Sequence, residues 1–356
     1  MKQRPVIALL AAPTSSAAVL YGLYDVLYSA GAVFLDMVLG VPGQEKLDIR
    51  IVSADGRPFR CPGNVLVEPH DSLESLVQCD AILVCDMYSP IHSVPRQDYS
   101  IYGPWLRGMH ERGVLIGSVC SGALVLAEAG LLDGRDVASH WAYAELFARE
   151  YPKSRFLRES ILCLTHAEEG IVTAGGVTAW QELVLHVIAR FCGAEVARQT
   201  AKVHLMVGHE QGQLPFAAMN RRVEAEDGVI AACQTWIAGH YQEPNPVQRL
   251  TEMSGLNART FARRFKAATG RSAIDYVVEL RIEEAKQVLE TTDGPIDDVS
   301  WAVGYQDAAA FRKMFRKLAG VTPLEYRRRY SIYRQDLGKR GNSHLQSPGQ
   351  AQASLT

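Results

Sequence analysis

A pattern of residues near the C-terminal end of this 356-residue chain occurs twice, with the two copies about fifty positions apart. Each copy has a glycine, two phenylalanines four positions apart, a second glycine and a tyrosine, and basic residues surround the phenylalanines. The two copies are Gly255, Phe261, Phe265, Gly270, Tyr276 and Gly304, Phe311, Phe315, Gly320, Tyr326. From the first phenylalanine onward the spacing is identical. A repeat of this length indicates a duplicated supersecondary unit.

Each copy predicts a supporting helix, a turn with glycine and a basic second helix. In the first copy the helices are predicted over 247–253 and 258–268, with Asn257 as the N-cap. In the second copy they are predicted over 296–303 and 308 to about 318, with Asp307 as the N-cap. Residues on the faces away from the paired phenylalanines are Arg259, Thr260, Arg263, Arg264 and Lys266, then Arg312, Lys313, Arg316 and Lys317. These basic faces are predicted to be free to meet DNA phosphates and base edges.

The segment between the two units predicts one long helix over 274–291. Its expected buried positions are Tyr276, Val277, Leu280, Ile282, Ala285, Val288 and Leu289. At about 1.5 Å per residue such a helix is roughly 27 Å long, which is close to the roughly 34 Å between successive major grooves on one side of DNA. A connector of this length could hold both basic helices on one side of a duplex.

A single basic amphipathic helix is more often the exposed face of a helical bundle, but two copies with matched glycines and caps favour DNA binding. Residues 229–330 resemble the AraC/XylS-type DNA-binding domain, which has two helix-turn-helix motifs and a linker helix. The second copy carries this resemblance in Gly304, Tyr305, Phe311, Phe315, Gly320, Pro323, Tyr326 and Arg327. The resemblance implies promoter DNA and RNA polymerase as partners.

The resemblance also implies which side chains face DNA. The predicted contacts are Arg259, Thr260, Ala262, Arg263, Lys266, Gln306, Ala308, Ala309, Arg312 and Lys313. Arg263 is the best candidate for reading guanine, because a guanidinium matches the O6 and N7 acceptors. The second helix begins with three alanines, 308–310, which can at most touch thymine methyl groups. We therefore expect the first motif to read sequence and the second to add mainly affinity.

The charge distribution agrees with a DNA-binding segment at the C-terminal end. Basic residues exceed acidic ones by four in 228–335, whereas acidic residues exceed basic ones by seven in 1–227. The seven cysteines are dispersed without metal-ligand spacing, which fits a reducing cytoplasm. No apolar run approaches eighteen residues and no signal peptide is recognisable, so we expect a cytoplasmic protein without a membrane segment. The stretch from about 338, rich in Gly, Ser and Gln, predicts a disordered tail.

The first 195 residues alternate short apolar runs with helical patterns. Strands are predicted over 6–11, 49–53, 81–85, 114–119 and 171–174, and helices at about 18–30, 98–112, 121–130, 141–150 and 177–192. This alternation predicts an α/β doubly wound, flavodoxin-like N-terminal domain, followed by an all-α C-terminal domain with two helix-turn-helix motifs. Ligands of such sheets lie at the carboxyl ends of the strands.

One predicted strand end carries a cysteine. Residues 114–119 lead directly into Cys120, and a helix follows, so Cys120 lies on a strand-to-helix turn like a nucleophile elbow. The helix dipole would favour its thiolate. His140 follows a predicted short strand over 136–139. By itself, such a cysteine is more often a small buried residue than a nucleophile.

The sequence around Cys120 and His140 resembles the PfpI-type branch of the class I glutamine-amidotransferase-like superfamily, at residues 119–123, 126–135 and 140–141. Later stretches, 173–176, 193–197 and 212–216, agree with its version fused to an AraC-type domain, the GlxA-like group of transcriptional regulators. Enzymes of the superfamily use the elbow Cys, a His, an acid from the first helix region and a glycine-rich oxyanion turn. Here Val19 occupies the expected acid position, Asp25 is the alternative acid, and the turn at 85–88 lacks paired glycines.

These departures predict a ligand pocket in which catalysis has been lost. Its predicted residues are Asp86, Met87, Cys120, Ser121, His140 and Gly175, with Cys120 and His140 as vestigial catalytic residues and no metal or cofactor. The chain is predicted to comprise a sensor and dimerisation domain over 1–210, a linker over 211–228, a DNA-binding domain over 229–335 and a tail over 336–356. The resemblance implies a homodimer, most often an activator, whose effector is an amino-acid-derived or quaternary-amine metabolite. The alternatives are a Cys-dependent amidase or hydratase, or a thiol redox sensor, coupled to the DNA-binding domain.

Overall fold

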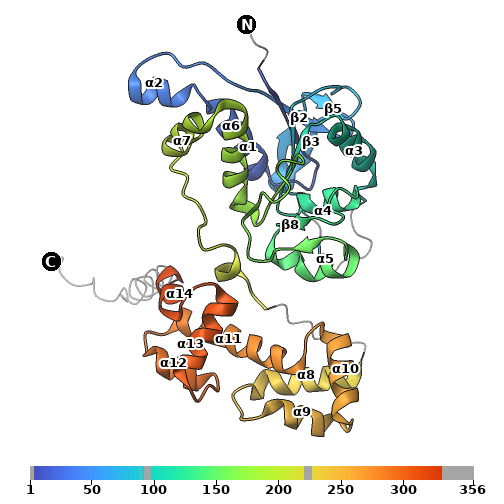
Figure 1. Cartoon of the computed structure of the whole chain (residues 1–356), viewed down its shortest axis with the longest axis vertical. Helices are drawn as coiled ribbons and strands as arrows, with labels where there is room; N and C mark the ends of the chain where they lie inside the picture. Colours follow the sequence, from blue (N-terminus) through green and yellow to red (C-terminus); the bar gives the residue numbers. More distant parts are fainter. Residues whose placement is uncertain (1–3, 89, 92–97, 220–226, 331–356) are drawn as a thin grey trace, which may run out of the picture. The chain divides into compact units, whose positions relative to one another are not determined.

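The computed structural model describes residues 4–88, 90–91, 98–219 and 227–330 (Figure 1). The chain divides into two compact units, one ending at Ala217 and the other beginning at Ala218. The predicted tail over 336–356 and residues 220–226 of the predicted linker lie outside the described residues. Each unit has its own hydrophobic core and is described separately below.

The first unit is built on a seven-stranded sheet with the order β10-β11-β7-β6-β1-β2-β5. All neighbouring strands are parallel except β10, which runs antiparallel to β11. The strands are β1 (Val6–Leu10), β2 (Asp48–Ser53), β5 (Asp71–Ser72), β6 (Ala81–Val84), β7 (Leu115–Val119), β10 (Leu162–Cys163) and β11 (Ile171–Ala174). The five strands predicted from the sequence all lie in this sheet, and their carboxyl ends meet at one edge.

Helices cover both faces of the sheet. Along β1, Ile7 and Leu9 enter one core, and Ala8 and Leu10 enter the other, because successive side chains point to opposite faces. The first core contains residues of α1 (Ala17–Ser29), α6 (Trp180–Cys192) and α7 (Ala194–Val203). The second contains residues of α3 (Gly103–Glu111), α4 (Gly122–Glu128) and α5 (Ala144–Glu150). The predicted doubly wound, flavodoxin-like fold is confirmed.

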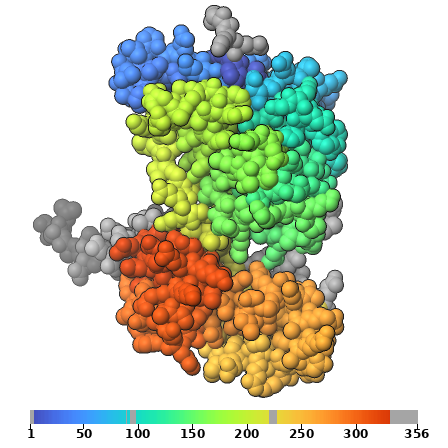
Figure 2. Space-filling view, viewed as in Figure 1, coloured from blue at the N-terminus to red at the C-terminus, as the bar shows by residue number. Residues whose placement is uncertain are grey.

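Several short elements of this unit were not predicted. They are β5, β10, α7, α2 (Val33–Leu39), the hairpin β3 (Phe59–Cys61) and β4 (Val65–Val67), the strand β9 (Arg155–Phe156), and 3-10 helices at Pro62–Asn64 and Leu214–Phe216. The short strand predicted over 136–139 is present as β8 (Asp136–Val137), and 3-10 helices at Ser100–Tyr102, Trp141–Tyr143 and Val177–Ala179 lie at the start of three predicted helices. Helix α2 is apolar on nearly all sides, so it has little helical periodicity to detect. Its Met37, Val38 and Leu39 are exposed. The helix belongs to the blue segment at the surface of this unit in Figure 2.

Among the residues that the structure describes, no single helix is both long enough and apolar enough to cross a bilayer. The bent pair of α1 and α2 meets the length and composition requirement only when the two helices are taken together.

The second unit is helical over 228–330. Its helices are α8 (Gly228–His240), α9 (Pro246–Ser254), α10 (Ala258–Thr269), α11 (Ala273–Thr291), α12 (Ile296–Ala302), α13 (Ala308–Ala319) and α14 (Pro323–Tyr330). Both predicted caps are present. The Asn257 side chain accepts a hydrogen bond from the Thr260 N–H at 2.9 Å, and Asp307 accepts from the N–H groups of Ala309 and Ala310 at 2.9 and 3.2 Å. The two helix-turn-helix motifs are therefore α9–α10 and α12–α13.

Helix α11 joins two separate cores. Its first half contributes Tyr276 and Leu280 to the core around Phe261 and Phe265, and its second half contributes Ile282 and Leu289 to the core around Phe311 and Phe315. Most of the buried positions predicted for this helix are buried. Val288 is only partly buried, and Ala302 of α12, predicted to support the second motif, is exposed, since the sequence pattern does not fix how far each helix turns from its neighbours.

Candidate functional site

The predicted DNA contacts of the first motif lie on the surface of α10. Arg259, Ala262, Arg263 and Lys266 are exposed, and Thr260 in the first turn is half-buried. Phe261 and Phe265 lie on the opposite face, at 2 and 0 per cent exposure, and hold α10 against α11. Two guanidinium groups and an ammonium group therefore project from one helix that its own core holds in place.

The second motif presents a less polar helix. Gln306, Ala309, Arg312 and Lys313 are exposed, and Ala308 is half-buried at the start of α13. In its first turn, helix α13 offers methyl groups where α10 offers the guanidinium group of Arg259, so the start of α10 is better suited to hydrogen-bond base edges.

Two of the basic side chains are engaged within the protein. Arg264 of α10 donates from Nε and Nη2 to the two carboxylate oxygens of Asp227, at 2.7 and 2.6 Å, and this pairing lowers the pKa of Asp227. Asp227 also caps α8, accepting from the Val229 and Ile230 N–H groups. Arg312 pairs with Asp297 of α12. The prediction of an entirely free basic face was therefore wrong for these two residues, because acidic partners distant in sequence fold onto them.

The remaining basic candidates stay available. Within the described part of the chain, Arg259, Arg263, Lys266 and Lys313 form no ion pair with an acidic side chain. A cation without an internal partner can neutralise a phosphate at no cost in lost protein contacts.

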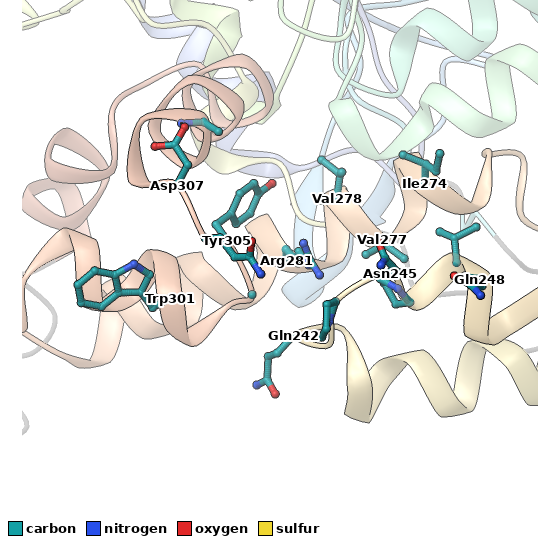
Figure 3. A pocket seen from close by; sticks show the side chains of 16 residues that line it. Gln242, Asn245, Gln248, Ile274, Val277, Val278, Arg281, Trp301, Tyr305 and Asp307 are labelled. Carbon is teal, nitrogen blue, oxygen red and sulfur yellow. The ribbon is translucent and has the colours of Figure 1, made fainter.

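A groove of about 1100 Å³ lies between the two motifs, with α11 along it (Figure 3). Asn245 and Gln248 come from the start of α9, and Trp301 and Gln306 come from the second motif. Arg281 of α11 lies 5.6 Å from the centre of the Tyr305 ring, and its guanidinium donates to the backbone carbonyls of Tyr241 and Glu243. Arg281 thus contacts both Tyr305, in the turn of the second motif, and the loop that precedes α9.

In the first unit, Cys120 has the predicted elbow geometry. It connects β7 to α4 with a φ of +52°, a region that residues other than glycine rarely adopt. Its neighbour Gly122 leaves no room for a side chain, since a Cβ there would lie 2.6 Å from the Val84 carbonyl oxygen. The Ser139 hydroxyl donates to the Cys120 carbonyl oxygen at 2.6 Å, which ties the elbow to the segment before His140.

The acid beside Cys120 is Asp86. This carboxyl group is 7 per cent exposed at the end of β6, and its burial raises its pKa to about 6 although it accepts a hydrogen bond from the Ser16 N–H. Burial, and then the charge of Asp86, raise the pKa of the Cys120 thiol to about 12. Hydrogen bonds from Ser121 at the start of the helix lower this pKa, but burial has the larger effect, so the thiol is held in its protonated form.

The other predicted pocket residues differ in how deeply they are buried and in which core they join. Ser121 is buried at the start of α4, His140 is half-buried, and Gly175 follows β11. Met87 is fully buried in the core under α3 and α4, whereas Cys120 belongs to the core under α1 and α6. The alternative acid, Asp25, is exposed on α1, and Val19 is buried in the same helix. In the described residues, no group of three His, Cys, Asp or Glu side chains is arranged to hold a metal ion.

Gln213 was noted in the sequence only as part of a family-like stretch. It is 2 per cent exposed, and its side chain hydrogen-bonds to the segments on both sides of His140. A glutamine in an irregular stretch between glycine and proline gives no periodic signal, so its burial could not be predicted.

Replacing Asp86 with asparagine is expected to stabilise the first unit more at pH 8 than at pH 4.5. A carboxyl group whose pKa is raised in the folded state does not lower the free energy of unfolding through its charge while it is protonated in both the folded and the unfolded chain. It destabilises the fold as the pH rises from about 4 through 6. A shift of about two units corresponds to about 3 kcal/mol. Urea unfolding of both proteins at the two pH values measures this difference. Asp55→Asn, at an exposed carboxylate, is the control, and an equal gain at both pH values would contradict the burial argument.

Both units of the chain resemble known protein families. Residues 37–190 match the DJ-1/PfpI family model, and residues 250–329 match a helix-turn-helix domain model. The regulator CdhR of Pseudomonas aeruginosa is 27% identical over 285 residues, 78% of this chain and 80% of its own length. GlxA of Rhizobium meliloti is 27% identical over 70% of this chain and 76% of its own. GbdR of Pseudomonas aeruginosa is 25% identical over 82% and 78%. All three are named as HTH-type transcriptional regulators.

The two motifs, their connecting helix and the flavodoxin-like unit define a protein that binds DNA through paired helix-turn-helix motifs. The chain joins a DJ-1/PfpI domain to an AraC-type helix-turn-helix domain, and it is similar over most of its length to these transcriptional regulators. It is a DNA-binding transcriptional regulator.

Proposed function

We propose that the first unit binds a small metabolite at the Cys120 elbow without catalysis and forms a homodimer, and that the second unit binds promoter DNA and activates transcription with RNA polymerase in the cytoplasm. Asp86, Cys120, Ser121, His140 and Gly175 are the proposed ligand contacts. The relatives' names as transcriptional regulators support a regulatory rather than an enzymatic role.

The hydrogen bonding of His140 is the observation that most supports a site without catalysis. Its Nδ1 accepts a hydrogen bond from the Ala142 N–H at 3.2 Å, so in the neutral ring Nε2 carries the proton. Burial lowers the pKa of His140, which keeps the ring neutral. In the described residues, no hydrogen bond joins His140 to the Cys120 thiol. In this arrangement a backbone N–H, rather than the Cys120 thiol, occupies the acceptor nitrogen of His140, which argues against a general-base role.

An enzymatic or redox role for Cys120 is the second candidate function. The observation that favours it is the backbone of Cys120, whose φ of +52° is the kind of strain that functional sites retain. The buried carboxyl of Asp86 beside the thiol could serve as the acid that position 19 lacks.

Ligand binding can be tested by screening candidate effectors. A panel of amino-acid-derived and quaternary-amine metabolites is added to the full chain, and the melting temperature of the first unit is measured. A ligand at a hundred times its Kd stabilises the native state by about 2.7 kcal/mol. A shift that Asp86→Asn or His140→Ala reduces supports this site, whereas a shift that neither variant changes would place the ligand elsewhere.

For the DNA-binding unit, Arg263→Ala and Lys313→Ala are expected to have different effects. Loss of Arg263 removes a guanidinium suited to guanine, so discrimination should fall by about 1–3 kcal/mol at one base pair. Loss of Lys313 should weaken binding to all sequences alike and lower the slope of log affinity against log salt by about one. Binding of each variant to duplexes selected by the wild-type chain from random sequences measures both effects. The reverse pattern would contradict the proposed division between the motifs.

A further inference from the structure

The side chain of Gln213 makes a set of buried hydrogen bonds close to the end of the first unit. This residue lies four positions before Ala217, the last residue of that unit. Its Nε2 donates to the carbonyl oxygens of Ser139 and Ser160, both at 2.8 Å, and its Oε1 accepts from the Trp141 N–H at 3.2 Å. Both N–H bonds of the amide are thus used, and no other side chain of this length supplies two donors and an acceptor in this geometry.

The surrounding backbone is shaped around this amide. A Cβ at position 175 would lie only 2.3 Å from Gln213 Nε2, so the turn after β11 accommodates the amide only with glycine there. The Gln213 backbone N–H donates to the Glu159 carbonyl oxygen at 3.0 Å. Gln213 therefore joins three segments at the strand ends, namely the loop after β8, the stretch before β10 and the turn after β11.

The same bonds hold His140 from both sides. Gln213 accepts from the residue after His140 and donates to the carbonyl of the residue before it. That preceding residue, Ser139, is fully buried and donates its hydroxyl to the Cys120 carbonyl at 2.6 Å. A continuous path of hydrogen bonds thus runs from the elbow through Ser139 to Gln213, in the segment that leads out of the first unit.

We propose that Gln213 is a positioning residue that couples occupancy of the pocket at Cys120 and His140 to the segment leaving the first unit, and so to DNA binding. This inference rests on the proposed ligand site and identifies how its state is transmitted. A ligand that moves His140 or the elbow must change the bonds of Gln213, because this amide has no donor left for an alternative partner. Coupling of this kind acts equally in both directions.

The test uses the full chain and does not need the effector. Gln213→Glu keeps an acceptor for the Trp141 N–H but places a carboxylate against two carbonyl oxygens. Ser139→Ala removes only the hydroxyl that reaches Cys120 and leaves every bond of Gln213 in place. Gln78→Glu makes the same chemical change as Gln213→Glu at an exposed position of this unit. Hydrogen–deuterium exchange is measured over residues 120–123, 139–142 and 212–217.

We expect Gln213→Glu to speed exchange at 120–123 as well as at 212–217, and Ser139→Ala to speed exchange at 212–217 although its side chain does not touch that segment. Both variants should change affinity for the selected duplex about fivefold or more, while Gln78→Glu leaves it unchanged. Faster exchange confined to each substituted site, with unchanged DNA affinity, would overturn the inference. If Gln213→Glu does not fold, the change in exchange at 212–217 caused by Ser139→Ala decides the inference by itself. If the wild-type chain selects no duplex, DNA binding itself fails, and the exchange results then decide only the coupling between the elbow and the segment leaving the first unit.

Discussion

Replacing Phe315 with alanine is expected to unfold the second helix-turn-helix motif while the first unit stays folded. Phe315 is fully buried, and its ring lies 5.5 Å from that of Tyr326 and 5.7 Å from that of Phe311. Removing a buried phenylalanine costs about 3–5 kcal/mol, which is a large share of the stability of a small core. The equivalent change in the first motif is Phe265→Ala, since Phe265 packs on Tyr276 at the same 5.5 Å.

Urea unfolding followed by far-ultraviolet circular dichroism, together with DNA affinity, measures the effect. We expect Phe265→Ala to abolish sequence preference and Phe315→Ala to reduce affinity, because the exposed Arg259 and Arg263 of the first motif are the side chains proposed to read bases. Lys317→Ala, an exposed change on the same helix as Phe315, is the control for stability. Retained motif structure in Phe315→Ala would show that the paired phenylalanines do not hold the recognition helix.

The second large effect concerns Cys120, whose thiol is expected to react with iodoacetamide about a thousandfold more slowly than an ordinary thiol at pH 8. A pKa of about 12 in place of 9 leaves about a thousandfold less thiolate, which is the reacting species. The half-buried Cys192 should be labelled before Cys120. Mass spectrometry of peptides after timed labelling identifies each site, and labelling in guanidinium, where all seven cysteines react alike, is the control.

Fast labelling of Cys120 would revive the enzymatic and redox candidates. Cys120→Ser then separates them, because loss of turnover indicates an enzyme and loss of a response to oxidants indicates a sensor. Unchanged regulation in this variant, together with slow labelling, agrees with a binding pocket.

Local sequence patterns were sufficient to predict the main elements. The caps Asn257 and Asp307 form as expected, since an N-cap depends on residues within one turn. The turn at Cys120 was equally predictable, because a strand followed at once by small residues and a helix constrains the backbone. Patterns with a period of two or 3.6 residues depend only on near neighbours, and they located the five predicted strands and both helix-turn-helix motifs, although helices α7 and α8 were not predicted.

The contacts that the sequence did not predict join residues far apart in the chain. Arg264 pairs with Asp227 across 37 positions, and Gln213 bonds to Ser139 across 74. The large effect of burial on the pKa of Cys120 was likewise not predicted, because burial and the charge of Asp86 are properties of the folded unit. Electrostatic and hydrogen-bonding details of the site therefore required coordinates.

Helix α11 has one further consequence. Its two halves are anchored in different cores, around Phe265 and around Phe315, so neither motif can turn about the helix axis without breaking its own core. Each residue of an α-helix advances the chain by about 100° and 1.5 Å. A single residue inserted in the middle of α11 would rotate one motif relative to the other by that angle. A point substitution would leave the relative orientation of the two motifs unchanged. The number of residues in α11 thus sets how the two motifs are oriented relative to each other, and with it the spacing of the DNA sequences that such a chain recognises.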